Sequence, residues 1–182
     1  MASIILRPTS GASSNWNNIG NAYDGNESTS ASVSVSIFSS PMTLTLNFDT
    51  SVIPSGATIN SATLTLRSKA GKTTITANVD INGDEGSRVI NQKQSTTITN
   101  YTADVTSYMS GLTSVNVDVN NNNWSRNTFE LYELWIDVDY TESVTPTSTL
   151  NIKLGATTIN NICIGNTKVT KVYIGNTLVF EN

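Results

Sequence analysis

Residues 74–81 read Thr-Ile-Thr-Ala-Asn-Val-Asp-Ile, and this stretch decides the fold class. Apolar residues alternate in it with Thr, Asn and Asp. Because successive side chains of a β-strand point to opposite faces of the sheet, the alternation predicts a strand with one buried and one solvated face. Half-buried strands of this kind are typical of antiparallel sheets.

The same alternation recurs along most of residues 1–142. Turn residues separate the runs: Pro54 and Gly56 lie between two of them, Asn82-Gly83 follows a third, and an Asn tract covers residues 120–123. Many short strands separated by turns are typical of two packed sheets. We therefore predict an all-β domain over residues 1–142, an antiparallel, jelly-roll-like β-sandwich, whose further strands cover residues 32–37, 43–48, 63–67, 115–119 and 134–140.

One segment departs from the alternation. From Asp104 onward, apolar residues recur at the spacing of one helical face. Asp104 suits the N-cap of a helix, and Gly111 suits the position just past its end. We therefore expect one short helix, with a buried face made by Val105, Tyr108, Met109 and Leu112.

Residues 143–149 are polar and contain a proline, which is typical of a linker. After them a ten-residue repeat places Gly-Ala or Gly-Asn pairs between apolar β-formers, at residues 155–156, 165–166 and 175–176. Two-residue loops of this kind join the strands of hairpins, so residues 150–182 predict a small β-meander. A segment below about 40 residues rarely folds without a partner, disulfide or metal. We therefore expect an attachment or oligomerisation module that makes its contacts through Ile162, Val172, Ile174 and Phe180.

The composition argues against several classes of protein. The chain has 182 residues, a net charge of −4, no histidine and one cysteine. A His-based triad, an internal disulfide and a Cys-based zinc site are therefore ruled out. The chain has only ten Lys and Arg residues, so we do not expect a basic surface that binds nucleic acid. No apolar run approaches the roughly 18 residues of a membrane helix, and residues 1–7 lack the features of a secretory signal.

Asp80, Asn82 and Asp84 resemble the opening of a calcium-binding loop, in which oxygen ligands occupy alternate positions. The pattern is incomplete, because the glycine comes one place late and Asn91 stands where a glutamate is required. The alternative, which the residues favour, is a strand that ends in an Asn-Gly turn. A calcium site at these three residues is kept as a hypothesis.

No catalytic arrangement stands out. A glycosidase needs two carboxylates that face each other across a cleft, and the acidic residues lie mostly on solvated strand faces or in turns. A serine nucleophile needs a base, and only lysines could serve. We therefore expect neither enzymatic activity nor a cofactor.

Trp16 and Trp124 both lie in Asn-rich stretches. An exposed tryptophan among asparagines could stack on a sugar while the amides bind its hydroxyl groups. It could equally anchor a subunit interface, where tryptophan is enriched. The third possibility, that these side chains fold back and close the ends of the sandwich, is an ordinary structural role.

Several stretches together resemble a known group of proteins. Residues 16–18 (Trp-Asn-Asn) precede 21–25 (Asn-Ala-Tyr-Asp-Gly), and 53–59 (Ile-Pro-Ser-Gly-Ala-Thr-Ile) precede 62–66 (Ala-Thr-Leu-Thr-Leu). Residues 134–141 (Leu-Trp-Ile-Asp-Val-Asp-Tyr-Thr) look like a closing strand. In this order, the stretches resemble β-sandwich proteins of tailed-bacteriophage virions.

Two further segments extend the resemblance. Residues 104–106 and the amphipathic turn after them are similar to bacterial surface domains shaped like carbohydrate-binding modules, and residues 168–177 resemble repeats that end phage structural proteins. The resemblance implies a non-enzymatic virion accessory protein, such as a capsid decoration, head-fibre, collar or tail component. It would bind other virion proteins as a homo-oligomer, for which a trimer is favoured over a dimer. The alternative is a carbohydrate-binding module that mediates adsorption to the host surface.

Overall fold

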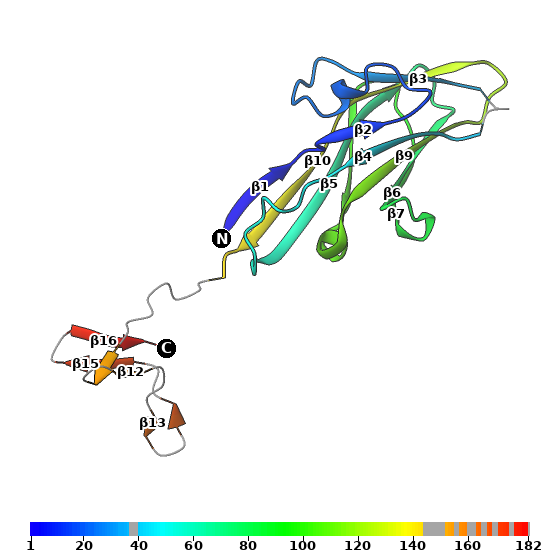
Figure 1. Cartoon of the computed structure of the whole chain (residues 1–182). Coiled ribbons are helices and arrows are strands. Elements are labelled where there is room, and N and C mark those ends of the chain that lie inside the picture. Colours follow the sequence, from blue (N-terminus) through cyan, green and yellow to red (C-terminus); the bar gives the residue numbers. More distant parts are fainter. Residues whose placement is uncertain are drawn as a thin grey trace. The chain divides into compact units, whose positions relative to one another are not determined.

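The structure is a computed structural model that describes residues 1–36 and 40–143 and, further along, the backbone of the C-terminal strands named below. The chain divides into two compact units, Met1–Glu142 and Ser143–Asn182. Figure 1 shows both units, and each is described by itself.

Two antiparallel sheets form the first unit, which confirms the predicted β-sandwich (Figure 1). In one sheet, the long strand β10 pairs with β5 along one edge and with β1 and β3 along the other, and β8 lies beyond β5. The other sheet has the order β2-β4-β9-β6-β7. The first sheet consists of β1 (Ala2–Leu6), β3 (Ala31–Val35), β5 (Thr58–Ala70), β8 (Thr99–Asp104) and β10 (Asn127–Thr141). The second consists of β2 (Ser10–Ala12), β4 (Met42–Asn47), β6 (Ile75–Ile81), β7 (Arg88–Lys93) and β9 (Ser114–Asn121).

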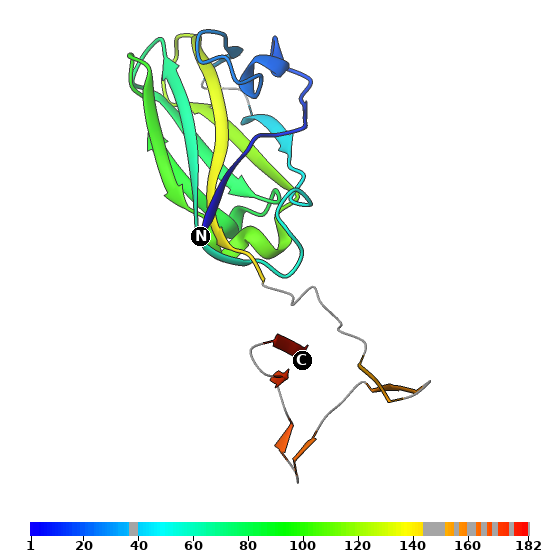
Figure 2. The same ribbon diagram turned by 90° about the vertical axis from the view of Figure 1, so that its left-hand side faces the viewer.

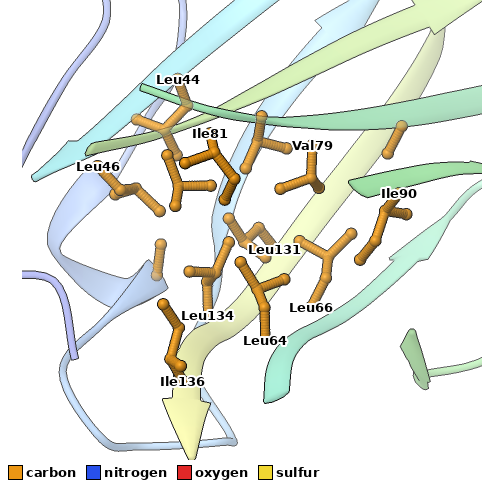
Figure 3. Close-up of a cluster of buried hydrophobic side chains, with 14 of the residues drawn as sticks. Leu44, Leu46, Leu64, Leu66, Val79, Ile81, Ile90, Leu131, Leu134 and Ile136 are labelled. Atoms are coloured by element: carbon orange, nitrogen blue, oxygen red, sulfur yellow. The ribbon is translucent and has the colours of Figure 1, made fainter. Parts of the chain in front are cut away.

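The core lies between the two sheets. In β6, every second residue from Ile75 to Ile81 is buried, as the alternation of residues 74–81 predicts. Figure 3 shows two of them, Val79 and Ile81, facing side chains of β5 and β10 from the other sheet. The opposing leucines and isoleucines interdigitate, which removes their apolar surface from water and is the main source of the unit's stability. The side chains labelled there are Leu44, Leu46, Leu64, Leu66, Val79, Ile81, Ile90, Leu131, Leu134 and Ile136.

The predicted helix is present, but as a 3-10 helix, η3 (Thr106–Gly111). Its N-cap position is Val105, one residue later than the predicted Asp104. The Asp104 carboxylate still accepts hydrogen bonds from the backbone N–H and hydroxyl of Thr106, in the first turn. The expected apolar face is buried against the core, apart from the half-buried Tyr108. The structure also contains two shorter 3-10 helices, η1 (Ile19–Ala22) and η2 (Glu85–Ser87). They were not predicted because segments of three or four residues are too short to show a helical period. No helix among the described residues is both long and apolar enough to span a bilayer.

Strand β10 runs the length of the first unit. Its fifteen residues correspond to about 45 Å of extended chain. Ala2 pairs with Tyr140, so β1 starts beside the end of β10, and Figure 2 shows the N-terminus next to this end. The loop that precedes β10 therefore lies at the opposite end of the sandwich from the point where the chain leaves the first unit.

The strands of the second unit pair as three hairpins: β11 (Ile152–Leu154) with β12 (Thr157–Ile159), β13 (Cys163–Ile164) with β14 (Thr167–Lys168), and β15 (Lys171–Ile174) with β16 (Thr177–Glu181). In each hairpin, the last residue of the first strand pairs with the first residue of the second strand, which comes three positions later in the chain. Within the described strands no pairing joins one hairpin to the next, so three two-stranded sheets stand where a single meander was predicted. Each hairpin contains only two to four residue pairs.

The predicted contact residues of this unit lie largely outside the described part of the chain. Ile162 lies outside it altogether, as does the linker beyond Ser143. Val172 pairs with Phe180, and Ile174 pairs with Thr177, but only the backbone of these residues is described. Their role in attachment stays a prediction.

Candidate functional site

Trp16 is a core residue. Its side chain is 7% exposed, and its ring meets that of Phe129 edge to face with 5.8 Å between the centroids. The indole N–H donates to the carbonyl oxygen of Met42 at 3.3 Å. An enclosed indole cannot stack on a sugar, so the predicted ligand role of Trp16 is wrong, and the side chain closes the sandwich instead.

Asp80, the first predicted calcium ligand, is committed to an ion pair. It is buried on β6, and its two carboxylate oxygens accept hydrogen bonds from the Nε and Nη2 of Arg88 at 2.8 and 3.0 Å. The paired carboxylate raises the pKa of the Arg88 guanidinium through hydrogen bonding. Its oxygens therefore face β7 and not a loop.

Asn82 and Asp84, the other two predicted ligands, hold the turn after β6. Asn82 adopts a left-handed backbone conformation with φ of 54°, and its Oδ1 accepts from the backbone N–H groups of Thr113 and Ser114. The Asp84 carboxylate accepts from the Gly86 N–H at 2.9 Å. Because β6 ends at Ile81, the three side chains diverge and the predicted calcium site is not formed. No group of three acidic or cysteine side chains in the described part of the chain could hold a metal ion.

Asp118 lies beside Asp80 on the outer face of the second sheet. Desolvation raises the pKa of Asp118, a hydrogen bond from the Thr43 hydroxyl lowers it, and the neighbouring Asp80 raises it again. Asp80 and Asp118 are diagonal neighbours in the pairing of β6 with β9. Asp80 is bound to Arg88, and Asp118 accepts a hydrogen bond from Thr43, so neither flanks a sugar as the paired carboxylates of a glycosidase do. The pair is therefore a structural element of the sheet face.

Glu133 is a second buried carboxylate, located where a β-bulge between Leu131 and Glu133 interrupts the pairing of β10 with β5. Desolvation raises its pKa, and hydrogen bonding from the Gly25 N–H and the charge of Arg7 lower it. The Gly25 N–H donates to Oε2 at 3.1 Å, and Arg7 Nε lies 3.3 Å from Oε1. Glu133 thereby holds the 24–29 loop on the first sheet, and both oxygens have internal partners.

Trp124 has the opposite environment from Trp16. It lies in the loop between β9 and β10, at the end of the sandwich away from the exit of the chain, and is 77% exposed. Large aromatic side chains are normally buried for most of their area, so an indole presented to solvent marks a candidate binding surface.

The loop that carries Trp124 is held in place by Asn121. The Asn121 Nδ2 donates to the carbonyl oxygens of Val35 at 3.1 Å and Ser125 at 2.9 Å. Its Oδ1 accepts from the Thr74 hydroxyl at 2.9 Å and from the Asn123 N–H at 3.1 Å. A single buried amide thus connects three segments of the chain around the base of the loop and restricts the positions that Trp124 can adopt.

The β5–β6 loop packs against the same base. The Gly71 N–H donates to the carbonyl oxygen of Thr128 at 2.9 Å, and the Lys72 ammonium donates to the Ser125 hydroxyl at 3.0 Å. The two loops approach closely at Gly71, since a Cβ at this position would lie 2.6 Å from Oδ1 of Asn127 and would force that side chain to shift. The two loops therefore form one surface.

An open groove of about 680 Å³ lies on the β4 side of this end. β4 begins with Met42 opposite Val119, close to the point where β9 ends. The groove is lined mostly by hydroxyl and amide groups, which can exchange hydrogen bonds with a polar ligand. Its lining residues are Ala12, Ser13, Ser14, Asn15, Pro41, Thr43 and Thr45. A second pocket, of about 350 Å³, lies at the other end near Ile59 and Met109, and neither pocket is lined by a carboxylate.

Sequence reasoning identified Trp124 but missed its supports. The Asn tract of residues 120–123 indicates a turn, whereas β9 extends to Asn121 and buries it, in phase with Val115, Val117 and Val119. Lys72 carries no comparable signal, because its place beside Ser125 depends on how β5, β6, β9 and β10 pair.

No known protein family matches the sequence, and no curated protein is similar to it. Among solved structures, the chain is similar to the CBM36-1 domain of a multidomain xylanase from the hindgut metagenome of Trinervitermes trinervoides. The two share 11% identity with a TM-score of 0.40, and the similarity covers 78% of this chain and 100% of that domain.

Proposed function

We propose that the first unit is a non-catalytic carbohydrate-binding module, with its site at the end of the sandwich that carries Trp124. The observation that supports this most is the 77% exposure of Trp124 on a loop tied down by Asn121. A rigid aromatic side chain loses little conformational entropy on binding, and its flat apolar face matches the C–H face of a pyranose ring.

The neighbouring groups suit the rest of a sugar. Sugars present hydroxyl groups that both donate and accept hydrogen bonds. The groove offers the hydroxyls of Ser14 and Thr45 and the amide of Asn15, while the Ser13 and Thr43 hydroxyls already donate within the protein and can serve a ligand as acceptors. Side chains of this kind fix the orientation of a ligand, while the aromatic contact supplies most of the binding energy.

The proposed site also suits display. It lies at the end of β10 opposite Glu142, where the chain leaves the first unit, so a ligand can reach it without contacting the residues that lead out of this unit. The virion role predicted from the resemblance, an accessory protein that binds other virion proteins as a homo-oligomer, with a trimer favoured, stays a proposal, and adsorption to the host surface is its alternative.

The experiment is a glycan array probed with the full chain, followed by calorimetric titration of the best ligand. Trp124→Ala is expected to weaken binding by about thirtyfold, because truncation of a tryptophan at the centre of an interface costs about 2 kcal/mol or more. Trp124→Phe, which keeps an aromatic face, should retain most of the affinity.

Trp135→Phe is the matched control. Trp135 lies on the outer face of the first sheet and donates to Asp137, so this variant changes an aromatic residue away from the proposed site. It should bind like the wild type. Full affinity in Trp124→Ala, or no glycan bound by the wild type, would contradict the proposed function.

A further inference from the structure

The first unit is acidic, and its positive charges are distributed unevenly. Residues 1–142 contain seven Lys or Arg residues and thirteen Asp or Glu residues, a net charge of −6. Four of the seven cations form ion pairs: Arg7 with Glu133, Arg67 with Glu27, Lys69 with Glu130, and Arg88 with Asp80. In the described part of the chain, Lys72, Lys93 and Arg126 form none.

These three cations lie at one end of the sandwich, the end that carries Trp124. Lys72 lies in the β5–β6 loop and bonds Ser125, two residues before Asn127 begins β10. Arg126 follows Ser125 and is exposed. Lys93 ends β7 opposite Thr76, at the start of β6, and is also exposed.

The same end is poor in negative charge. The two loops, residues 71–74 and 122–126, contain no acidic residue. The acids that come nearest in the strands are already engaged: Glu130 accepts from Tyr132 and pairs with Lys69, and Asp118 accepts from Thr43. Because exposed charges interact over about a Debye length of 8–10 Å, the three cations give this end a local positive potential within an acidic unit.

We infer that the glycan bound at the Trp124 end is an acidic polysaccharide, with carboxylate or ester sulfate groups on its sugars; this rests on the proposed function. A neutral sugar would use Trp124 and the groove but leave the charges of the three cations without an anionic partner. An anionic sugar uses both, with its ring on the indole, and the Arg126 guanidinium can bind a carboxylate or sulfate through two N–H groups.

Single-stranded nucleic acid is the competing polyanion, since its bases also stack on aromatic side chains. The charge balance disfavours it. Nucleic-acid-binding domains are strongly basic, whereas this unit has a net charge of −6 and offers three cations.

Titration of the full chain with four probes separates these ligands: hexagalacturonate for carboxylates, a sulfated galactan for ester sulfates, cellohexaose as a neutral sugar, and oligothymidylate for nucleic acid. At 50 mM NaCl, at least one acidic glycan should bind more tightly than cellohexaose and oligothymidylate. Raising the NaCl concentration to 300 mM should weaken acidic-glycan binding about tenfold, because exposed charge pairs are screened.

The variant test removes Lys72 and Arg126 by Lys72→Gln with Arg126→Gln. Affinity for the acidic glycan should fall about tenfold, and most of the salt dependence should disappear. Lys153→Gln with Lys168→Gln, which removes two charges from the second unit, should have no such effect.

The outcomes separate the two proposals. Tight, salt-independent binding of cellohexaose that is lost only in Trp124→Ala would overturn the acidic ligand but leave the carbohydrate-binding function intact. Preferred binding of oligothymidylate, or wild-type affinity for the acidic glycan in the Lys72 and Arg126 double variant, would also overturn it. If Trp124→Ala binds every glycan as the wild type does, the proposed function fails as well.

Discussion

Trp16→Ala is expected to lower the free energy of unfolding by about 3–5 kcal/mol, the usual cost of removing a large aromatic side chain from a core. The substitution removes the edge-to-face contact with Phe129 and leaves the carbonyl of Met42 without its indole donor. Urea unfolding followed by far-ultraviolet circular dichroism measures the change.

Two comparisons make this result specific. Trp16→Phe keeps part of the packing volume and should cost much less than Trp16→Ala. Trp124→Ala, at 77% exposure, should leave the unfolding midpoint within experimental error. Equal stability of the Trp16→Ala variant and the wild type would contradict the burial of Trp16.

Asn121→Ala is expected to have the second-largest effect, a loss of about 2–3 kcal/mol in the free energy of unfolding, because buried polar partners lose their hydrogen bonds. The carbonyl oxygen of Val35 loses its bond to the amide, and the bonds to Thr74 and Ser125 are lost too. Glycan binding should weaken about tenfold even where the protein remains folded, since the Trp124 loop is no longer held in one position.

Asn122→Ala is the matched control for Asn121→Ala. Asn122 is the exposed neighbour in the same Asn tract, and its substitution should change neither stability nor binding. Urea unfolding and calorimetric titration of both variants measure the two effects. If Asn121→Ala and Asn122→Ala had the same stability and the same glycan affinity, the Asn121 side chain would not be the support of the loop.

The sandwich could be predicted because the alternation of residues such as Ile75, Ala77, Val79 and Ile81 is a local property of each strand. The order of the strands in each sheet could not, because it depends on pairings between residues far apart in the sequence. The predicted helix lay in the right place, but apolar spacing alone did not distinguish a 3-10 helix from an α-helix or identify Val105 as its N-cap.

The two tryptophans show where local reasoning about the site stops. Trp16 and Trp124 have similar neighbours in the sequence, yet one packs on Phe129 and the other is exposed. The difference arises from tertiary packing, which brings Phe129 to Trp16 from a distant strand. The calcium hypothesis for Asp80 fails because its partner Arg88 comes from the neighbouring strand β7, whereas the favoured alternative, a strand that ends in an Asn-Gly turn, is confirmed.

The most direct test of the carbohydrate-binding site is a nuclear magnetic resonance titration of the isotopically labelled full chain with its best glycan. Backbone amide shifts should concentrate at residues 71–74 and 120–127, and the indole N–H of Trp124 should shift while that of the buried Trp16 does not. Shifts confined to the outer face of the first sheet around Trp135, or to the second unit, would contradict the account.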